Sequence, residues 1–176
     1  SAYRVSGFDK CLGITVDGSG DFCTTALFEC NKNKINYLKK IFYPHSLGIF
    51  YQTMTQFLGF KNYGDEYKMM GLSSFGKPEY YDIISKNIFR SEESINLNLK
   101  FFNHTSRNYS YKFSGKPNQS ALFNEKINSL LNINELEIKE DISQTQKNLA
   151  ASVQKIFEYK LMKIIKKIKD INFSDN

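Results

Sequence analysis

The sequence is poor in the residues that build metal sites and disulfides, with two histidines and three cysteines among 176 residues. His45 and His104 have no histidine or cysteine at ligand spacing, so we do not expect a zinc site within the chain. Cys11, Cys23 and Cys30 form no CxxC pair. Because their number is odd and no secretory signal precedes them, we interpret them as reduced, buried structural thiols of a cytoplasmic protein.

Long apolar runs are also missing. No stretch approaches the ~20 apolar residues that span a bilayer, so we expect no membrane partner. The opening residues, SAYRVSGFDKC, contain neither an initiator methionine nor a signal peptide, and we expect a piece of a longer protein. A hydrophobic fraction of 41% and an aromatic fraction of 15% are typical of a folded chain, and 176 residues suit a single domain.

The sequence contains no P-loop, no GxGxxG and no GxSxG nucleophile elbow. A Ser-His-Asp arrangement stays open, because such residues need not be close in sequence. The net charge of +6 comes largely from a lysine-rich stretch over 155–169, which we interpret as the solvated face of a helix. The alternative is a helix that docks on nucleic acid, but base stacking needs aromatic residues, and Tyr159 is the only one within 158–171.

The first part of the chain predicts a three-stranded antiparallel meander. Residues 11–17, 22–30 and 35–43 are rich in β-branched and apolar side chains. Asp17-Gly18, followed by Ser19-Gly20, predicts the turn between the first two strands. With the helices expected further on, the fold class is mixed α/β (α+β).

The rest of the chain predicts helices around an irregular insertion over 90–118. Gly59 stands where a helix C-cap glycine belongs, and Ser143 with Gln146 forms a capping box. The expected helices cover 46–58, a segment from Pro78 to about 89, 119–131 and 143–171, and an alternating strand over 95–101 has a possible partner at 109–113.

The stretch VDGSGD, at the end of the first predicted strand, admits two interpretations. Backbone N–H groups in a glycine-rich turn form an anion site, and Asp17 would hold a metal or a water beside a phosphate. Asp-Gly is equally the signature of an ordinary tight turn. A calcium loop is excluded, because its sixth and twelfth positions would be Phe22 and Phe28.

The stretch GDEYKMMGLSSFGKP, residues 64–78, is either a surface turn or the wall of a ligand site. Its glycines allow close approach of a ligand to the backbone, and its charged residues carry both signs. Composition alone leaves both interpretations open. The residues concerned are Gly64, Asp65, Glu66, Lys68, Gly71 and Gly76.

Three blocks of the sequence resemble one family. VDGSGDFCTTALFEC resembles the VDG-x-GE-x-x-TT hairpin of the nodulation-type O-carbamoyltransferases, which include the tobramycin and cephem carbamoylating enzymes. The block SLGIFYQTMTQFLGFKNYGDEYKMMGLSSFGKP is similar to the family's next block, and NLAASVQKIFEYKL is similar to its later helix beginning AASVQ. The blocks follow the family's order over about 1–160, although no family motif can be quoted for the stretch between about 90 and 140.

The resemblance implies a fold and a site. The family's first domain has the duplicated ribonuclease-H-like fold of actin and the sugar kinases, so residues 1–43 would open its second half. The Asp17–Gly20 hairpin would then face the nucleotide phosphates. The segment 64–78 would be a loop on the nucleotide side of the same cleft, with Glu66, Lys68 and Gly71 lining it.

The resemblance also implies a reaction. The family moves a carbamoyl group from carbamoyl phosphate, through a carbamoyl-adenylate made with ATP, to a hydroxyl of a sugar or related natural product. By that resemblance Gly18, Ser19, Gly20 and Lys68 would stabilise the negative charge of the adenylate. Asp17 would act as a base or as a metal ligand, with iron or magnesium as the metal of the full-length protein.

The sequence departs from the family in ways that matter. The family's histidine-rich metal motif would precede Ser1 and its GGVALN block would follow Asn176, so we expect a fragment without a complete active site and without activity alone. LSSFG replaces the common LAPYG, which removes a proline and a tyrosyl hydroxyl from the loop. An actin-like sugar kinase or ATPase that uses the same hairpin is the alternative enzyme.

Overall fold

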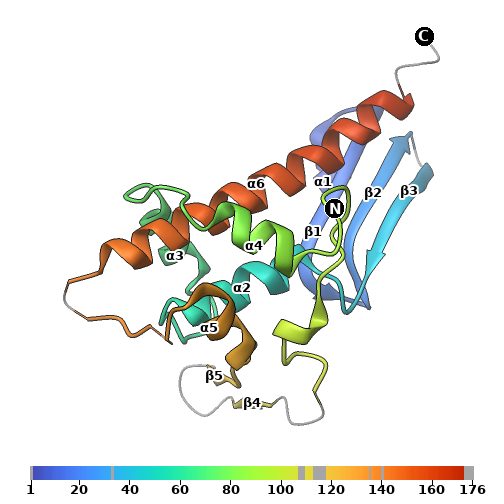
Figure 1. Ribbon diagram of the computed structural model, residues 1–176. Coiled ribbons are helices and arrows are strands. Elements are labelled where there is room, and N and C mark those ends of the chain that lie inside the picture. The colour runs from blue at the N-terminus through green and yellow to red at the C-terminus, as the bar shows by residue number, and fades with distance from the viewer. Residues whose placement is uncertain are drawn as a thin grey trace. The chain divides into compact units, whose positions relative to one another are not determined.

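The computed structural model describes residues 2–32, 34–106, 110–112, 118–134, 136–139 and 141–172. The chain divides into two compact units, Ser1–Ile49 and Phe50–Asn176, and each unit is described by itself (Figure 1). Together their elements make a mixed α/β protein, which confirms the predicted fold class. No helix of the described part is long and apolar enough to cross a membrane.

The first unit is built on a three-stranded antiparallel sheet in the order β1-β2-β3, as predicted (Figure 1). A short helix α1 (Ala2–Ser6) precedes the strands β1 (Lys10–Gly20), β2 (Cys23–Asn31) and β3 (Lys34–Phe42). The central strand β2 carries most of the buried residues of the sheet, whereas β3 is exposed at almost every position. All three cysteines are free thiols, and of these only Cys30 is fully buried.

The turn between β1 and β2 lies further along the chain than predicted. Gly20 pairs with Cys23, so Asp21 and Phe22 form a two-residue turn with φ values of 47° and 64°. Positive φ at both central residues is the geometry of a type I′ hairpin turn. The prediction of a tight turn at Asp17–Gly20 is therefore wrong, because β1 continues through these residues with φ values outside the left-handed region.

The long helix α6 (Gln144–Asn172) is packed against α3 (Glu66–Ser73) and α4 (Tyr81–Ile88) in the second unit. Helix α2 (Leu47–Phe57) enters this unit from the first, and α5 (Glu125–Leu131) lies near the 3₁₀ helix η1 (Leu99–Phe101). A two-stranded ladder joins β4 (Tyr111–Lys112) to β5 (Asn118–Gln119). The core of this unit consists of apolar side chains with at most 1% exposure, namely Phe50, Met54, Phe57, Leu58, Met69, Ile84, Ile88, Leu97, Leu122, Ile127, Leu149, Ala150, Val153 and Ile156.

Two predicted helix ends are confirmed. Gly59 has φ +99°, and the hydrogen bonds from Gly59 N to Gln56 O and from Phe60 N to Thr55 O form a Schellman motif after α2. At the start of α6, Ser143 N donates to Gln146 Oε1 at 3.0 Å and Gln146 N donates to Ser143 Oγ at 3.2 Å. These two bonds form the predicted capping box.

The predicted strand over 95–101 is wrong. Ile95 and Leu97 are buried, but only Leu97 forms a β-bridge, an isolated one to Phe89, before the chain enters η1. The expected partner strand covered 109–113, of which the structure describes 110–112. Its residues Tyr111 and Lys112 form β4, which pairs with β5 instead, and residues 109 and 113 lie outside the described residues. The alternating burial here belongs to a packed loop, because within the described residues no second strand forms a ladder with this segment.

Two predicted helix starts are too early. Helix α5 begins at Glu125 rather than near residue 119, because Asn124 caps it by accepting from Lys126 N at 3.0 Å. Helix α4 begins at Tyr81 rather than at Pro78. The N–H groups of Lys77 and Tyr80 donate to side chains of α6 and are therefore held outside the helix.

Candidate functional site

A β-bulge at the end of β1 forms the centre of the candidate site. Val16 pairs with Thr25 and Gly20 pairs with Cys23, so the three residues from Asp17 to Ser19 lie opposite a single residue of β2. Such bulges leave backbone groups out of the regular ladder and are common beside active sites. The predicted anion-binding residues therefore form a bulge in a strand rather than the tip of a hairpin.

The start of α2 lies directly against this bulge. Ser46 Oγ accepts a hydrogen bond from Ile49 N at 3.0 Å, which caps the helix, and donates to Asp17 O at 2.9 Å. A Cβ atom on Gly48 would lie 2.7 Å from Gly18 N, so only glycine allows this approach. The SLG sequence thus joins the first turn of α2 to the VDG sequence of β1.

This arrangement favours a bound anion. The first N–H groups of an α-helix have no partner within the helix, and the aligned peptide dipoles place positive potential at that end. Helix α2 is 11 residues long, and its first turn meets the bulge. Glycine-rich backbone beside a helix N-terminus is a common phosphate-binding arrangement.

Asp17 is the exposed acid of the bulge. Its Oδ1 accepts a hydrogen bond from Gly18 N at 2.6 Å, which fixes the carboxylate against its own loop. Asp17 therefore has the exposure and the fixed orientation that a base for a substrate hydroxyl needs.

Replacing Gly48 with alanine is expected to lower the free energy of unfolding. Overpacking costs about 1–3 kcal/mol, whereas alanine in place of glycine gains at most about 1 kcal/mol in a helix. The close approach to Asp17 and Gly18 should therefore outweigh the helix propensity. Urea denaturation measures the difference, and an increase in stability would show that α2 does not press against the bulge.

The segment 64–78 contains helix α3, so the predicted nucleotide-side loop is mainly helical. Asp65, with 7% exposure, precedes the first residue of α3. Its Oδ1 lies 2.7 Å from Lys68 Nζ, and its Oδ2 accepts hydrogen bonds from the backbone N and the side-chain Nδ2 of Asn62. Burial alone would raise the pKa of Asp65, but the hydrogen bonds from Lys68 and Asn62 outweigh it and lower the pKa. The hydrogen bond to Asp65 likewise raises the pKa of Lys68, which stays charged and tethered.

The far end of this segment is bound to α6. Lys77 N donates to Asn148 Oδ1 at 2.9 Å, and Tyr80 N donates to Ser152 Oγ at 2.9 Å. Gly76 passes so close that an added Cβ would lie 1.9 Å from Lys147 O. The block ending in GKP and the helix containing AASVQ, which lie far apart in the sequence, therefore form one packed structure.

The predicted residues of α3 are placed in different environments. Glu66 is half-buried, Lys68 is paired with Asp65, and Gly71 is exposed with open space beside it. Four large aromatic or apolar side chains on and around this helix are exposed beside its polar ones, namely Tyr63, Tyr67, Met70 and Phe75. This surface can stack or cover a flat ligand as readily as it can bind a charged one.

Comparison with known proteins decides the family. Residues 1–175 match the model of the family described as "Carbamoyltransferase N-terminus". The chain belongs to this carbamoyltransferase family. The resemblance of the three sequence blocks is thereby confirmed over essentially the whole chain.

Individual relatives agree with this assignment. The chain is 29% identical over 166 residues to "Uncharacterized protein sll1178" of Synechocystis sp., covering 93% of this chain and 25% of that protein. It is 32% identical over 98 residues to the nodulation protein NolNO of Sinorhizobium fredii, covering 51% of this chain and 14% of that protein. The nodulation protein NolO of Bradyrhizobium diazoefficiens is 37% identical over 81 residues, with 46% and 15% covered. The chain thus spans a quarter or less of the length of these relatives.

Within this member of the carbamoyltransferase family, four of the predicted residues lie on one element of the first unit and three on one element of the second. Asp17, Gly18, Ser19 and Gly20 belong to the bulged end of β1, whereas Glu66, Lys68 and Gly71 share α3. Sequence reasoning missed Ser46 and Gly48, which join α2 to the bulge. The signal that could have found them is the SLG sequence, which opens the expected helix over 46–58.

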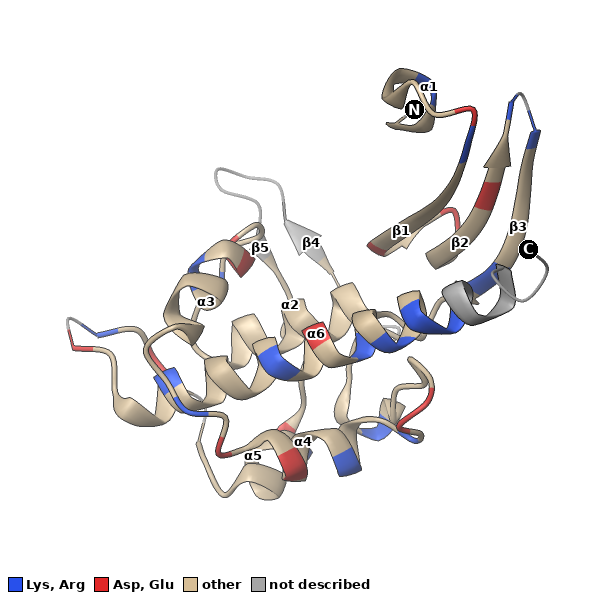
Figure 2. Ribbon diagram, turned by 90° about the horizontal axis from the view of Figure 1, so that it is seen from above, with Lys and Arg blue, Asp and Glu red and all other residues tan. Residues whose placement is uncertain are grey.

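The basic residues are less available than the sequence suggested. Figure 2 shows the lysines along α6 in blue, and three of them are engaged within the second unit. Lys163 lies 2.7 Å from Glu93, Lys167 lies 2.5 Å from Glu93, and Lys160 is 2% exposed. The lysines of this part of α6 therefore serve the packing of the segment that carries Glu93.

Proposed function

We propose that the chain is part of an enzyme that transfers a carbamoyl group from carbamoyl phosphate to a hydroxyl of a sugar or related natural product. The transfer proceeds through a carbamoyl-adenylate made with ATP. The observation that carries the proposal is the family match over residues 1–175. Because the chain covers a quarter or less of its relatives, we propose that it has no transfer activity alone.

In this proposal the bulge and α2 bind the phosphate groups. The N–H groups of Ser19 and Gly20 and the first turn of α2 stabilise negative charge, while Gly18 N orients the Asp17 carboxylate. Asp17 accepts the proton of the acceptor hydroxyl or orients that hydroxyl for attack on the carbamoyl carbon. We propose that this part of the chain belongs to a duplicated ribonuclease-H-like fold, with Glu66, Lys68 and Gly71 on its nucleotide side.

The family resemblance also implies a divalent metal, iron or magnesium. Among the described residues, no group of three or more His, Cys, Asp or Glu side chains is placed to hold a metal ion. This part of the chain therefore does not fit a complete metal site, and further residues would have to complete one. Asp17 stays proposed as a single ligand at most.

The reaction is tested in the full-length protein with carbamoyl phosphate, a hydroxyl acceptor, and ATP labelled separately at the α- and γ-phosphates. We expect a carbamoylated acceptor, with the α-label recovered as AMP and the γ-label never on the acceptor. Transfer of the γ-label to the acceptor would instead establish a sugar kinase. The 176-residue chain, assayed alongside, is expected to form no carbamoylated product.

A further inference from the structure

Cys11 and Cys30 lie directly opposite each other on neighbouring strands of the first unit. The antiparallel register of β1 and β2 pairs them within an unbroken run of the ladder from Lys10 to Val16. Directly opposed residues of an antiparallel pair carry their side chains on the same face of the sheet, so both thiols lie on one face. The bulge of β1 begins only after Val16 and leaves this pair in regular geometry.

The backbone spacing of such a pair suits a disulfide. Directly opposed residues have Cα atoms about 4.5–5.5 Å apart. Disulfides join Cα atoms about 4.4–6.8 Å apart. Both residues are free thiols in the structure. Because they share a face at this spacing, side-chain rotation can bring the two sulfurs together with little movement of the strands.

The two thiols differ in their access to solvent. Cys30 is fully buried, whereas Cys11 is half-buried. Burial, and then the neighbouring Cys11 thiol, raise the pKa of Cys30, so Cys30 stays protonated at neutral pH. Oxidation of a thiol requires that the oxidant reach its sulfur. Cys11 is therefore the thiol that meets an oxidant first, and Cys30 is placed to react with Cys11 afterwards.

The end of the sheet beside this pair is held in place. Lys32 N donates to Asp9 O at 2.7 Å, which continues the ladder two residues beyond the pair. Tyr3 Oη donates to Lys32 O at 2.7 Å and lies 3.0 Å from Asp9 O, so α1 joins both strands at this end. These bonds keep the two thiols opposite each other.

Cys23 is too far away to compete for either partner. It pairs with Gly20 beside the turn, at the other end of β2 from Cys30. Seven residues of strand span about 23 Å at about 3.3 Å per residue, several times the reach of a disulfide. Cys23 Sγ donates instead to Thr25 O at 3.5 Å. The sheet therefore allows one pair among the three cysteines.

We propose that Cys11 and Cys30 form an oxidation site, at which hydrogen peroxide or another hydroperoxide converts the two thiols into one cross-strand disulfide. The Cys11 thiolate attacks one peroxide oxygen, which forms an S–O bond, breaks the O–O bond and releases hydroxide. The Cys30 sulfur then attacks the Cys11 sulfur, the S–O bond breaks, and the proton of Cys30 leaves with the hydroxide as water. The two thiols together lose two electrons and two protons, and hydrogen peroxide is reduced to two waters. The site does not depend on the proposed carbamoyl transfer.

The experiment treats the reduced full-length protein with hydrogen peroxide, alkylates the remaining thiols and maps the peptides by mass spectrometry. Trypsin releases all three cysteines in one peptide, residues 11–32, because no lysine or arginine lies within it before its last residue. We expect this peptide to be two hydrogens lighter, with alkylation at Cys23 alone. Chymotrypsin, which cleaves after Phe22 and Phe28, separates the three cysteines and shows which two are joined.

Three variants assign the disulfide. Cys23→Ser is the matched control and should form it as the unaltered protein does. Cys11→Ser and Cys30→Ser should each lose it. In Cys30→Ser the oxidation should stop on Cys11 as a sulfenic or sulfinic acid, because no resolving thiol lies opposite. Dithiothreitol should restore three free thiols in the oxidised unaltered protein.

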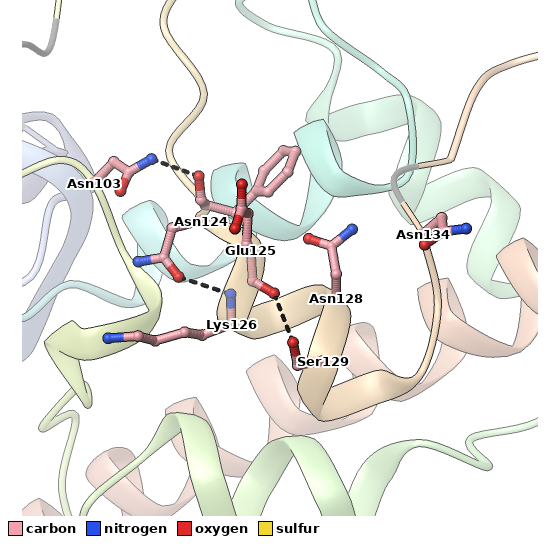
Figure 3. A pocket seen from close by; sticks show the side chains of 8 residues that line it. Asn103, Asn124, Glu125, Lys126, Asn128, Ser129 and Asn134 are labelled. Carbon is pink, nitrogen blue, oxygen red and sulfur yellow. Dashed lines mark hydrogen bonds between the residues drawn. The ribbon is translucent and has the colours of Figure 1, made fainter.

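Amide hydrogen exchange shows whether the effect is confined to the first unit. We expect residues 11–31 to exchange more slowly after oxidation, because a cross-link opposes local opening of β1 from β2. Helix α5 of the second unit is the reference, and its exchange should not change. At its start, Asn124 Oδ1 accepts from Lys126 N at 3.0 Å and Asn103 Nδ2 donates to Phe123 O at 2.6 Å (Figure 3).

Three outcomes would overturn the proposal. The first is the absence of a disulfide between Cys11 and Cys30 in the peroxide-treated protein. The second is a disulfide that includes Cys23 as often as either of the others. The third is an equal change of exchange in α5, since peroxide would then act on the protein as a whole. The peptide map of the unaltered protein decides the first two even where a serine variant fails to fold.

Discussion

Replacing Gly76 with alanine is expected to lower the free energy of unfolding by about 3 kcal/mol, the upper part of the range for overpacking. The added Cβ would lie 1.9 Å from Lys147 O and 2.2 Å from Lys147 C. These are backbone atoms of α6, so no side-chain rotation relieves the clash. The segment must move away from the helix, and the hydrogen bond from Lys77 N to Asn148 should weaken with it.

Gly71→Ala is the matched control for this variant. Gly71 is exposed within α3, and nothing lies within 4 Å of its added Cβ. Alanine there should stabilise the helix by about 0.5–1 kcal/mol through its higher helix propensity. Urea denaturation of both variants measures the two effects. Equal effects would mean that the approach of Gly76 to α6 does not support the segment 64–78.

Replacing Lys160 with methionine is expected to destabilise the second unit by about 2–4 kcal/mol. The buried Lys160 ammonium donates to three backbone carbonyls, those of Ser91, Glu92 and Ser94, at 2.7, 3.0 and 3.3 Å. It also lies 4.4 Å from the centroid of the Phe89 ring. Methionine fills the space but leaves the three carbonyls without their donor, so segment 91–94 should detach from α6.

Lys163→Met provides the control one turn further along α6. Lys163 pairs with Glu92 and Glu93, whose side chains are exposed, and exposed ion pairs contribute about 0–1 kcal/mol. Its loss should therefore cost far less than the loss of Lys160. If both variants lose the same stability, the three carbonyl contacts are not what holds segment 91–94.

The effect of Lys160 should also depend on pH. Burial lowers the pKa of Lys160 to about 8, from 10.5 in the unfolded chain. Between these values the unfolded state binds more protons, so this lysine makes stability rise with pH, by at most about 1.4 kcal/mol per pH unit. The stability difference between the unaltered chain and Lys160→Met should widen from pH 8 to pH 10. A constant difference would contradict the lowered pKa.

Much of the fold follows from local sequence patterns. The strands and the helix α6 were predicted because their apolar residues recur at regular spacing, and the ends at Gly59 and Ser143 because their signals are local. Helix α3 escaped notice because only Met69 and Leu72 along it are buried, which gives no apolar stripe. The false strand over 95–101 arose because alternating burial also occurs in a packed loop.

The candidate site was predictable only in part. The sequence VDGSGD predicted a candidate anion site and a turn at the same residues, but the turn is formed by Asp21 and Phe22. A non-glycine pair with positive φ is a poor match to the usual turn signals, so local sequence favoured the wrong position. The contact of Ser46 and Gly48 with Asp17 joins residues about thirty positions apart, which no local pattern encodes.

Turnover of the full-length protein with Asp17→Asn tests the central claim, that the acid on the β1 bulge takes part in carbamoyl transfer. Asparagine keeps an acceptor for Gly18 N but removes the charge and the basicity. We expect carbamoyl transfer to fall by about 10²-fold or more. Asp21→Asn, in the neighbouring turn, should retain full activity, because asparagine tolerates positive φ. Undiminished transfer by Asp17→Asn, and by Asp17→Ala beside it, would remove Asp17 from the mechanism.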